Sequence, residues 1–505
     1  KLAFPYRDNV EKLSLADLNR VAQKYFKNNN RTVGIFIPSK DEQRVKPTEF
    51  SNEQIATLTK DYKGKALEKE AAPFEASIAN LRNNLKEGVL SNGMKYGLVN
   101  KELKGEKIIA NFKFLIGNEK ELAGKSSVGA LTAALLSAGT KTKTKEQIQD
   151  RLDQLNSSLG FRTSGQNFLI NVSTYKNNFA EVMDILQDIL VNATFPQNEL
   201  TKMIAENNTY LEAQQKDPQA IANNELQRLA NPYPKESIFY TPTLQEEIDN
   251  NKKVTRDQIT AFYQNLMGAS NGFGTVLGSI DAKTTANSLE KTFGKYTAKT
   301  KYSEVKPTYF ETKKVDKNFI TPDKENAVAL GTEKFKIDQK HPDYAALVMA
   351  NEILGSGGFL SARLPMRLRE KEGISYGVGS YLSVPVTNDV ASWNYYAFFN
   401  PTKRDAVEAA WKEEVAKALK DGFTAQELAD NKKSYANVQQ TNLGMDNTLI
   451  NLVNKKLQYG VSLDEYDALN AKIQNLKLEE VNAALKKYLS LDKIISVYAG
   501  DFNKK

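Results

Sequence analysis

Hydrophobic and polar positions follow the same order in three stretches of the chain, residues 13–38, 254–281 and 476–501. Each stretch begins with apolar residues at helical spacing, continues through a polar turn and ends in an apolar run. This order predicts a short amphipathic helix followed by a β-strand. Ser14 and Thr255 directly precede two of these helices and have acidic residues after them, so both are predicted helix N-caps.

The three stretches recur at the length of a whole domain. Leu18 and Ile259, at equivalent helix positions, are 241 residues apart, and Ile259 and Val481 are 222 residues apart. Solenoid repeats recur at roughly 20–50 residues, so this period predicts duplicated domains instead. The first copy has only 12 residues before it. We therefore expect residues 1–40 to be the tail of a domain whose body lies upstream in a longer product or in a partner chain. An N-terminal extension docked on the rest of the chain is the alternative.

The remaining pattern predicts a charged, partly helical linker at 41–83 and two domains at 84–300 and 301–505. Asn92-Gly93 between alternating apolar residues predicts a β-hairpin at the start of the first domain. Strands followed by long helices predict an α+β architecture, with each sheet packed against helices. The other predicted elements are strands at 108–117, 327–333 and 391–399, and helices at 126–139, 145–160, 179–196, 342–358 and 404–420.

The sequence has few of the residue types that most often carry out catalysis or bind metals. The 505 residues include no cysteine, which excludes disulfides, thiolate zinc sites and cysteine nucleophiles. His341 is the one histidine, so histidine-based metal sites and triads have almost no basis within this chain. Because His341 directly precedes Pro342 at a helix start, it is predicted to be an exposed loop residue.

The charge pattern predicts neither a nucleic-acid partner nor a membrane span. The net charge of +8 is spread over the whole chain, and the lysines alternate with acidic residues. The lysine-rich run at 140–145 is predicted to be a solvated loop. No run of about 18 apolar residues occurs, and a membrane-spanning helix needs such a run.

The stretch "SARLPMRLREKEGISYGVGSYL" at 361–382 places Arg369 and Tyr376 seven positions apart, with Gly373 between them, just before a predicted strand. The two side chains would offer one cationic and one phenolic hydrogen-bond donor to a common site. The structural alternative is a surface salt bridge at Arg369 and a tyrosine that simply opens the strand at Tyr376.

Several stretches in the same order resemble the M16 peptidases, the family of pitrilysin and the mitochondrial processing peptidase. They are "LSNGMKYGLV" at 90–99, residues 114–148, residues 341–380 and the three helix–strand tails. The resemblance covers roughly 13–40 and 85–505. It implies tandem M16-type domains, each an antiparallel-rich sheet packed against helices, that together form half of a clam-shell.

The resemblance also locates where zinc would bind in an active member. Active members carry H-x-x-E-H on the first long helix, where two histidines bind zinc and the glutamate activates water. The matching positions here are Ala130, Ala133 and Ala134, and alanine cannot ligate a metal. The third ligand position matches Thr209 or Tyr210, while Glu206 and Glu212 are out of register. The resemblance thus implies no cofactor in this chain and zinc in a complementary half.

In the other half of an M16 clam-shell, an Arg/Tyr pair faces the zinc. The family pattern R-E-K-x-G-x-x-Y is matched from Arg369 to Tyr376, so the resemblance implies that these two side chains contact a peptide held on the zinc of the other half. A glycine-rich stretch implicated in substrate contact matches Gly355, Gly357 and Gly358. A helix C-cap and tight turn explain these glycines equally well.

The resemblance therefore implies the non-catalytic half of an M16-type zinc metalloendopeptidase. Its implied partners are a zinc-bearing half, on the same longer chain or on a separate subunit, and a peptide substrate. Its implied location is periplasmic or otherwise secreted. A cytoplasmic location is the alternative, because "KLAFPYRDNV" at the start has no apolar signal-peptide core. The second functional hypothesis is a metal-free scaffold or binding subunit of the same fold.

Overall fold

The structure is a computed structural model. It describes residues 71–358 and 361–503 continuously and, among the first seventy residues, positions 6, 9–10, 12–27, 29, 31–32, 34, 51, 53–54, 57 and 60. The chain divides into two compact units, Lys1–Lys69 and Glu70–Lys505, which are described separately.

The first unit contains the amphipathic helix α2 (Leu15–Tyr25). Ser14 is its N-cap, as predicted, and forms a capping box with Asp17. No residue of α2 is buried, and Leu18 is 53% exposed although it lies on the apolar face. Most of the strand predicted after α2 falls on residues outside the described part.

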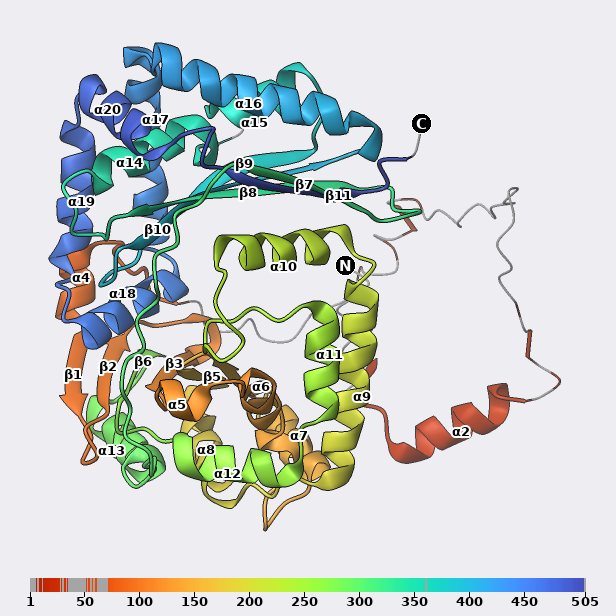
Figure 1. The fold of residues 1–505 in the computed structure, drawn as a ribbon. Helices are drawn as coiled ribbons and strands as arrows, with labels where there is room; N and C mark the ends of the chain where they lie inside the picture. Colours follow the sequence, from red (N-terminus) through yellow and green to blue (C-terminus); the bar gives the residue numbers. More distant parts are fainter. Residues whose placement is uncertain are drawn as a thin grey trace. The chain divides into compact units, whose positions relative to one another are not determined.

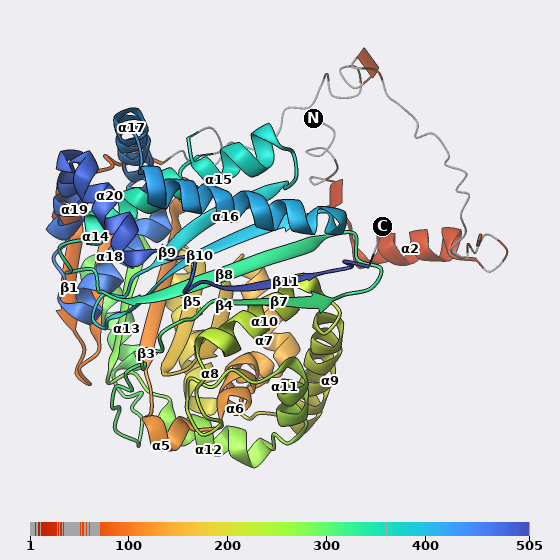
Figure 2. The ribbon, with the colours of Figure 1, turned by 45° about the horizontal axis from the view of Figure 1, so that its top comes forward.

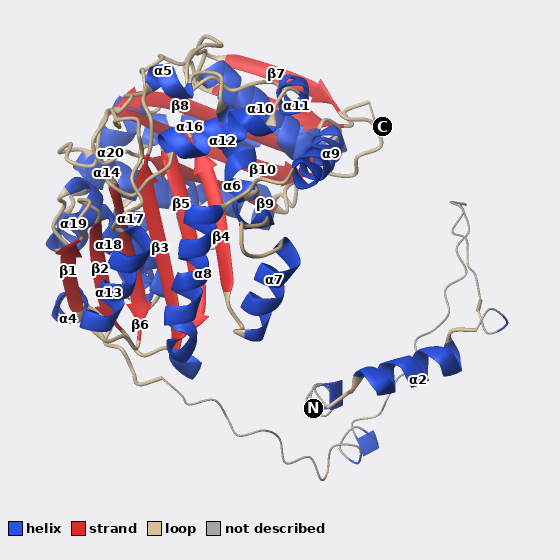
Figure 3. Ribbon diagram, turned by 90° about the horizontal axis from the view of Figure 1, so that it is seen from below, coloured by secondary structure: helices blue, strands red, loops and turns tan. Residues whose placement is uncertain are grey.

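The second unit holds two sheets. The first has six strands in the order β1-β2-β6-β3-β5-β4, with only the β2–β6 pair parallel (Figures 1 and 3). The predicted hairpin is confirmed, because β1 and β2 pair across Asn92 and Gly93. The strands are β1 (Leu85–Val89), β2 (Lys95–Asn100), β3 (Lys107–Leu115), β4 (Ser158–Ser164), β5 (Asn167–Tyr175) and β6 (Gly272–Gly278).

The second sheet has five strands in the order β7-β11-β8-β10-β9, and only the β7–β11 pair is parallel. It repeats the connectivity of the first sheet without a counterpart of β1. The predicted α+β class is therefore confirmed. The strands are β7 (Val315–Ile320), β8 (Ala327–Lys336), β9 (Gly377–Ser383), β10 (Val390–Phe399) and β11 (Ile495–Gly500).

Helices pack against both sheets. Those before residue 300 are α4 (Ile78–Asn83), α5 (Glu119–Leu122), α6 (Ser126–Ala134), α7 (Lys145–Gln154), α8 (Phe179–Asn192), α9 (Gln197–Gln214), α10 (Pro218–Ala230), α11 (Leu244–Lys252), α12 (Arg256–Leu266) and α13 (Ala282–Phe293). Those after it are α14 (Tyr344–Asn351), α15 (Arg363–Pro365), α16 (Arg404–Asp421), α17 (Ala425–Asn442), α18 (Asp446–Tyr459), α19 (Asp464–Asn475) and α20 (Leu478–Tyr488). Short 3₁₀ turns are η2 (Lys104–Glu106), η3 (Leu136–Ala138), η4 (Lys176–Asn178) and η7 (Pro401–Lys403).

The second and third copies of the repeated pattern fold as predicted. α12 precedes β6 and α20 precedes β11. Thr255 caps α12 with a capping box. Ile259 and Val481, at matching positions, are both fully buried. In each copy the helix packs against a helix rich in small residues, α12 on α6 and α20 on α14.

The helix predicted at 145–160 is too long. α7 ends at Gln154, and Ser158 already belongs to β4. Asn156 adopts a left-handed conformation with φ of 47°, which an α-helix does not accommodate. Leu159 continues the helical spacing of the leucines before it, so periodicity alone could not separate this strand residue from the helix. The helix predicted at 179–196 likewise ends at Asn192.

Each sheet is covered on one face by a helix from the other half of the chain. α10 buries Leu226 against β8 and β11 of the second sheet, and α18 buries Val453 against β2 and β6 of the first (Figures 1 and 2). The central strands β6 and β11 are consequently buried along their whole length. The last residues of the predicted linker also join this packing, because Ile78 and Leu81 of α4 are buried beside α18.

A buried carboxyl on β8 ties the end of the last helix to the second sheet. Glu333 is 3% exposed, and its Oε2 accepts a hydrogen bond from the Ser490 backbone N–H at 2.7 Å. Burial raises the pKa of Glu333 from 4.5 to about 7. The folded protein therefore holds a proton on Glu333 between these pH values, whereas the unfolded chain releases it.

We predict that Glu333→Gln removes a pH-dependent loss of stability. Since the folded state binds the extra proton, wild-type stability falls as the pH rises from about 4.5 to about 7 and is level above that. Relative to wild type, Glu333→Gln should gain about 1–3 kcal/mol between pH 5 and pH 8. Urea unfolding at both pH values measures this, with the exposed-site variant Glu212→Gln as control. An equal difference from wild type at both pH values would contradict the prediction.

Candidate functional site

The segment that carries the candidate donor pair contains two π-helical turns. The first, η5 (Glu352–Ser356), continues α14, and the Gly357 N–H donates to the Glu352 carbonyl at 2.9 Å. The second, η6 (Met366–Lys371), continues α15. π-helical turns are rare and occur frequently at functional sites. The helix predicted at 342–358 thus exists, but its C-terminal part is wider than an α-helix.

The three candidate glycines differ in how closely their neighbours approach. A Cβ on Gly355 would lie 2.3 Å from Ser380 Oγ of β9, and a Cβ on Gly357 would lie 2.7 Å from Asn431 Oδ1 of α17. At Gly358 the nearest atom would be 3.8 Å away. Packing therefore explains the first two glycines, whereas Gly358 has room for a side chain. Substrate contact by these glycines stays a prediction.

Arg369 lies on the second π-helical turn. Its side chain is 39% exposed, and its Nε lies 3.6 Å from Glu370 Oε1. At this separation and exposure the ion pair is weak. A planar guanidinium of this exposure can donate to carbonyl oxygens of another molecule.

Tyr376 lies directly before β9 and is 53% exposed. Its hydroxyl donates to Asn326 Oδ1 at 2.8 Å, and its backbone N–H donates to the Phe398 carbonyl of β10. Burial raises the pKa of the Tyr376 phenol, so the hydroxyl keeps its proton and can donate at neutral pH. The sheet thus fixes the backbone of Tyr376, and Asn326 fixes the hydroxyl of its half-exposed side chain.

The structure places Arg369 within η6 and Tyr376 directly before β9, on one short continuous segment. Gly373, with φ of 60°, turns the chain between them, which a residue with a Cβ does only under strain. Both side chains are partly exposed. Their contact with a substrate stays a prediction.

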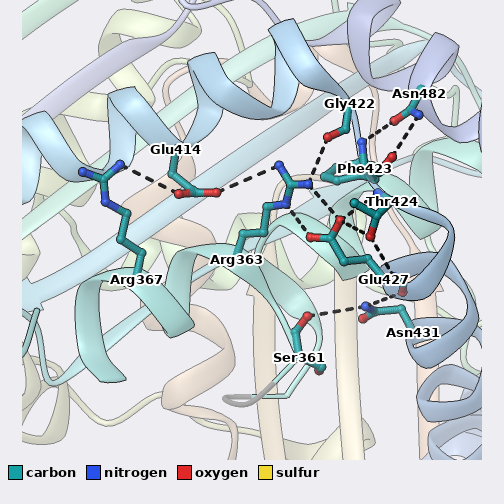
Figure 4. Close-up of polar contacts among 10 residues, drawn as sticks. All are labelled: Ser361, Arg363, Arg367, Glu414, Gly422, Phe423, Thr424, Glu427, Asn431 and Asn482. Atoms are coloured by element: carbon teal, nitrogen blue, oxygen red, sulfur yellow. Dashed lines mark hydrogen bonds and ion pairs between the residues drawn. The ribbon is translucent and has the colours of Figure 1, made fainter. Parts of the chain in front are cut away.

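Arg363 anchors this segment to α17. Its Nε and Nη2 donate to the two carboxylate oxygens of Glu427 at 2.6 and 2.8 Å, and Nη2 also donates to the Gly422 carbonyl (Figure 4). Its guanidinium lies 4.9 Å from the ring centroid of Phe423. Burial alone raises the pKa of Glu427, but hydrogen bonds from Arg363 and Thr424 bring it below its usual value, so the pair stays charged. A bidentate, half-buried pair of this kind fixes both side chains.

The anchor extends along α16. Glu414 lies 4.0 Å from Arg363 Nη1 and 3.8 Å from Arg367 Nη1, so one carboxylate serves both guanidinium groups (Figure 4). Sequence analysis missed this cluster. The Thr424–Glu427 capping box is visible in the sequence, but the pairing of Glu427 with Arg363 across 64 residues is not.

The positions that match the zinc motif lie on α6. Ala130 and Ala134 are exposed one turn apart, and Ala133 is buried. Methyl groups donate no electron pair, so these residues do not fit a zinc ion. Thr209 and Tyr210 are exposed on α9, where the Thr209 hydroxyl donates to the Ala205 carbonyl. In the part of the chain that the structure describes, no three His, Cys, Asp or Glu side chains are grouped to hold a metal.

His341 is less exposed than predicted, because its side chain is 31% exposed. Its Nδ1 accepts a hydrogen bond from the Asp343 backbone N–H at 3.1 Å, and its ring packs edge-on against Tyr488. His341 thus supports the first turn of α14 and has a structural role.

Two family models match consecutive parts of the chain. Residues 128–243 match the model described as insulinase, peptidase family M16, and residues 253–435 match the peptidase M16 inactive domain. The chain belongs to peptidase family M16. The family assignment made from the sequence is confirmed.

Curated M16 relatives of the chain carry contrasting names. An uncharacterized zinc protease, YmxG of Bacillus subtilis, is 24% identical over 371 residues, which are 72% of this chain and 86% of the relative. A non-peptidase homolog, also YmxG, of Helicobacter pylori is 24% identical over 377 residues, which are 74% of this chain and 84% of the relative. Identity at this level therefore does not separate peptidases from non-peptidases in the family.

Solved structures show the same M16 fold. The peptidase M16 inactive domain from Pseudomonas fluorescens has a TM-score of 0.69 at 21% identity and covers 83% of this chain and 98% of its own. The periplasmic protease PqqL from Escherichia coli has a TM-score of 0.65 at 16% identity. That match covers 96% of this chain but 50% of the Escherichia coli protein. The chain thus has the M16 fold and spans about half the length of the Escherichia coli protein.

We predict that Gly355→Ala destabilises the protein by about 1–3 kcal/mol, because the new methyl group overlaps Ser380 of β9. The matched change Gly358→Ala should stay within about 0.5 kcal/mol of wild type. Urea unfolding followed by circular dichroism measures both. Equal stability of the two variants would show that the close approach at Gly355 does not limit packing.

Proposed function

We propose that this chain is the non-catalytic half of an M16-type zinc metalloendopeptidase. It encloses peptides and presents Arg369 and Tyr376 to a substrate held at the zinc of a complementary half. The observation that carries the proposal is the Tyr376 hydroxyl, which keeps its proton at neutral pH, belongs to a half-exposed side chain and is held by Asn326. Ala130, Ala133 and Ala134 on α6 support this proposal. Alanine cannot ligate zinc, so the complementary half would have to carry the metal.

The two side chains suit the reaction that peptide hydrolysis requires. Attack of water on a peptide carbonyl develops negative charge on its oxygen, and the Tyr376 hydroxyl would donate to that oxygen. A donor of this kind contributes roughly 3–4 kcal/mol to transition-state stabilisation. Arg369 would bind neighbouring carbonyl oxygens of the peptide and fix its position. Zinc would activate the water in the other half.

Helix α2 supports the existence of a partner. Its apolar face exposes Leu15, Leu18 and Val21, whereas the matching faces of α12 and α20 are buried on small-residue helices. An amphipathic helix gains most of its stability by burying that face. We therefore propose that α2 packs on a small-residue helix of the complementary half, as expected for the tail of a preceding domain.

For location we propose the periplasm or another secreted compartment. The similar Escherichia coli structure is of a protease named periplasmic, which supports this location. No helix among the described residues has both the length and the apolar character to cross a bilayer.

The second candidate function is a metal-free scaffold or binding subunit. The relative named a non-peptidase homolog favours it, because its identity to this chain equals that of the relative named a zinc protease. The two candidates differ in whether Tyr376 affects turnover.

We predict that the purified chain has no peptidase activity alone. Adding the product of the gene directly upstream should give peptidase activity that a chelator abolishes.

In that assembled enzyme, Tyr376→Phe should lower kcat about 100-fold or more, because it removes the donor to the developing oxyanion. Cleavage of a quenched fluorescent peptide measures this. Tyr381→Phe is the matched control, since Tyr381 is also 53% exposed and lies on β9. Inertness on mixing, or unchanged turnover of Tyr376→Phe, would favour the scaffold.

We predict that Leu18→Glu weakens association with the complementary half at least about tenfold, because it places a charge on the apolar face of α2. Gln23→Glu adds the same charge on the opposite face of α2 and should leave association unchanged. Sedimentation of the mixed halves measures both. Equal association of the two variants would exclude α2 from the interface.

A further inference from the structure

Tyr376 and Asn326 lie at the same end of the second sheet, on either side of β10. Tyr376 directly precedes β9, and Asn326 directly precedes β8. β10 pairs with both strands, because Phe398 lies opposite Gly377 of β9 and opposite Val328 of β8 (Figure 2). The phenol of Tyr376 therefore crosses the end of β10 to reach Asn326, whose Oδ1 accepts a hydrogen bond from its hydroxyl at 2.8 Å.

The sheet fixes the backbone at both ends of this contact. The Tyr376 N–H donates to the Phe398 carbonyl at 3.1 Å, and the Ser375 hydroxyl donates to the same carbonyl at 2.8 Å. On the other side, Asn326 is followed at once by Ala327, the first residue of β8. The two side chains can therefore change their hydrogen bond without a change in the sheet.

The hydroxyl of Tyr376 has one proton to donate, and in this structure it donates to Asn326. The same proton cannot serve a substrate at full strength while Oδ1 accepts it. The phenolic oxygen itself still has lone pairs that can accept a hydrogen bond. The hydrogen bond to Asn326 must therefore be exchanged before Tyr376 can donate to a developing oxyanion.

The side-chain amide of Asn326 is able to make that exchange. An amide carries an acceptor and a donor in one plane, and a half-turn of its terminal group interchanges Oδ1 and Nδ2. Within the described part of the chain, the exposed Asn326 side chain makes no other hydrogen bond. The buried amide of Asn454 differs, because it accepts from Thr275 and donates to Asn111, which fixes its orientation.

We propose that Asn326 is a positioning residue that switches Tyr376 between two hydrogen bonds. In the first, Oδ1 accepts from the hydroxyl, as in this structure. In the second, the amide has turned, its Nδ2–H donates to the phenolic oxygen, and the hydroxyl donates to the carbonyl oxygen of a bound peptide. Hydrogen bonds in a chain strengthen one another, so the Tyr376 hydroxyl is a better donor in the second arrangement. The inference rests on the proposed function, because it describes how the hydroxyl becomes available to a substrate.

Titration of the Tyr376 phenol in the chain alone tests whether the amide turns. A phenolate has no proton to give to Oδ1, so Asn326 can stabilise it only through Nδ2–H. If the amide turns, Asn326→Ala removes that donor and should raise the pKa of Tyr376 by at least about 0.5. If the amide is fixed as an acceptor, it stabilises only the protonated phenol, and Asn326→Ala lowers the pKa instead. An unchanged or lowered pKa would overturn the proposal.

Fluorine NMR of protein that carries fluorotyrosine measures this pKa. The signal that is missing in Tyr376→Phe identifies the residue. Asn437→Ala, at an exposed asparagine of α17, is the matched control and should leave the titration of Tyr376 unchanged.

Turnover of the assembled enzyme tests whether the exchange serves catalysis. Asn326→Asp keeps an acceptor and loses the donor, so it should hold the phenol proton and lower kcat at least about tenfold, with KM changed less than about threefold. Lys324→Gln makes the same loop more negative by the same single charge and should leave kcat unchanged. In the Tyr376→Phe background, Asn326→Asp should cause no further loss, because the phenol proton is already absent.

Full kcat in Asn326→Asp, or an equal loss in both backgrounds, would also overturn the proposal. The two levels of inference fail in different ways. If Tyr376→Phe keeps full turnover, the proposed function is wrong, whereas the titration of the chain alone still decides how Asn326 holds the phenol.

Discussion

The structure depends on the exchange of two helices between the halves of the chain. A sheet whose central strand is buried on both faces needs a cover on each, and the local helices of each half cover only one. α18 supplies the second cover of the first sheet and α10 that of the second. Burial of a large apolar side chain contributes about 1.5–3 kcal/mol, and Leu226 and Val453 each contribute only when the other half is in place. The two sheets therefore form one compact unit, and the Arg369–Tyr376 segment has a rigid support.

Much of this fold could be predicted from the sequence because its signals are local. The spacing of Ile259 and Val481 revealed the duplicated helix–strand unit, and Asn92-Gly93 marked the hairpin. The exchange of α10 and α18 could not be predicted, since an apolar helix face does not specify which sheet it covers. The boundary at Asn156 was missed for a different reason: Leu159 fits a helical period and a strand equally well.

The candidate site could be predicted only where a motif carries it. The alignment with the M16 pattern located Arg369 and Tyr376, and the structure adds that a hydroxyl donor and a guanidinium share one anchored segment. The anchor itself was not predictable, because Arg363 and Glu427 meet through the packing of separate helices.

The helix exchange also sets the order of events during synthesis. The last strand of the first sheet ends at Gly278, but α18 begins only at Asp446, 168 residues later. At roughly 5–20 residues per second, a ribosome needs on the order of 10–30 s to make that stretch. Throughout this interval one face of the nascent first sheet, including Phe273 and Leu277, has no cover. The nascent chain therefore exposes apolar surface until α18 is made, and its folding is completed late.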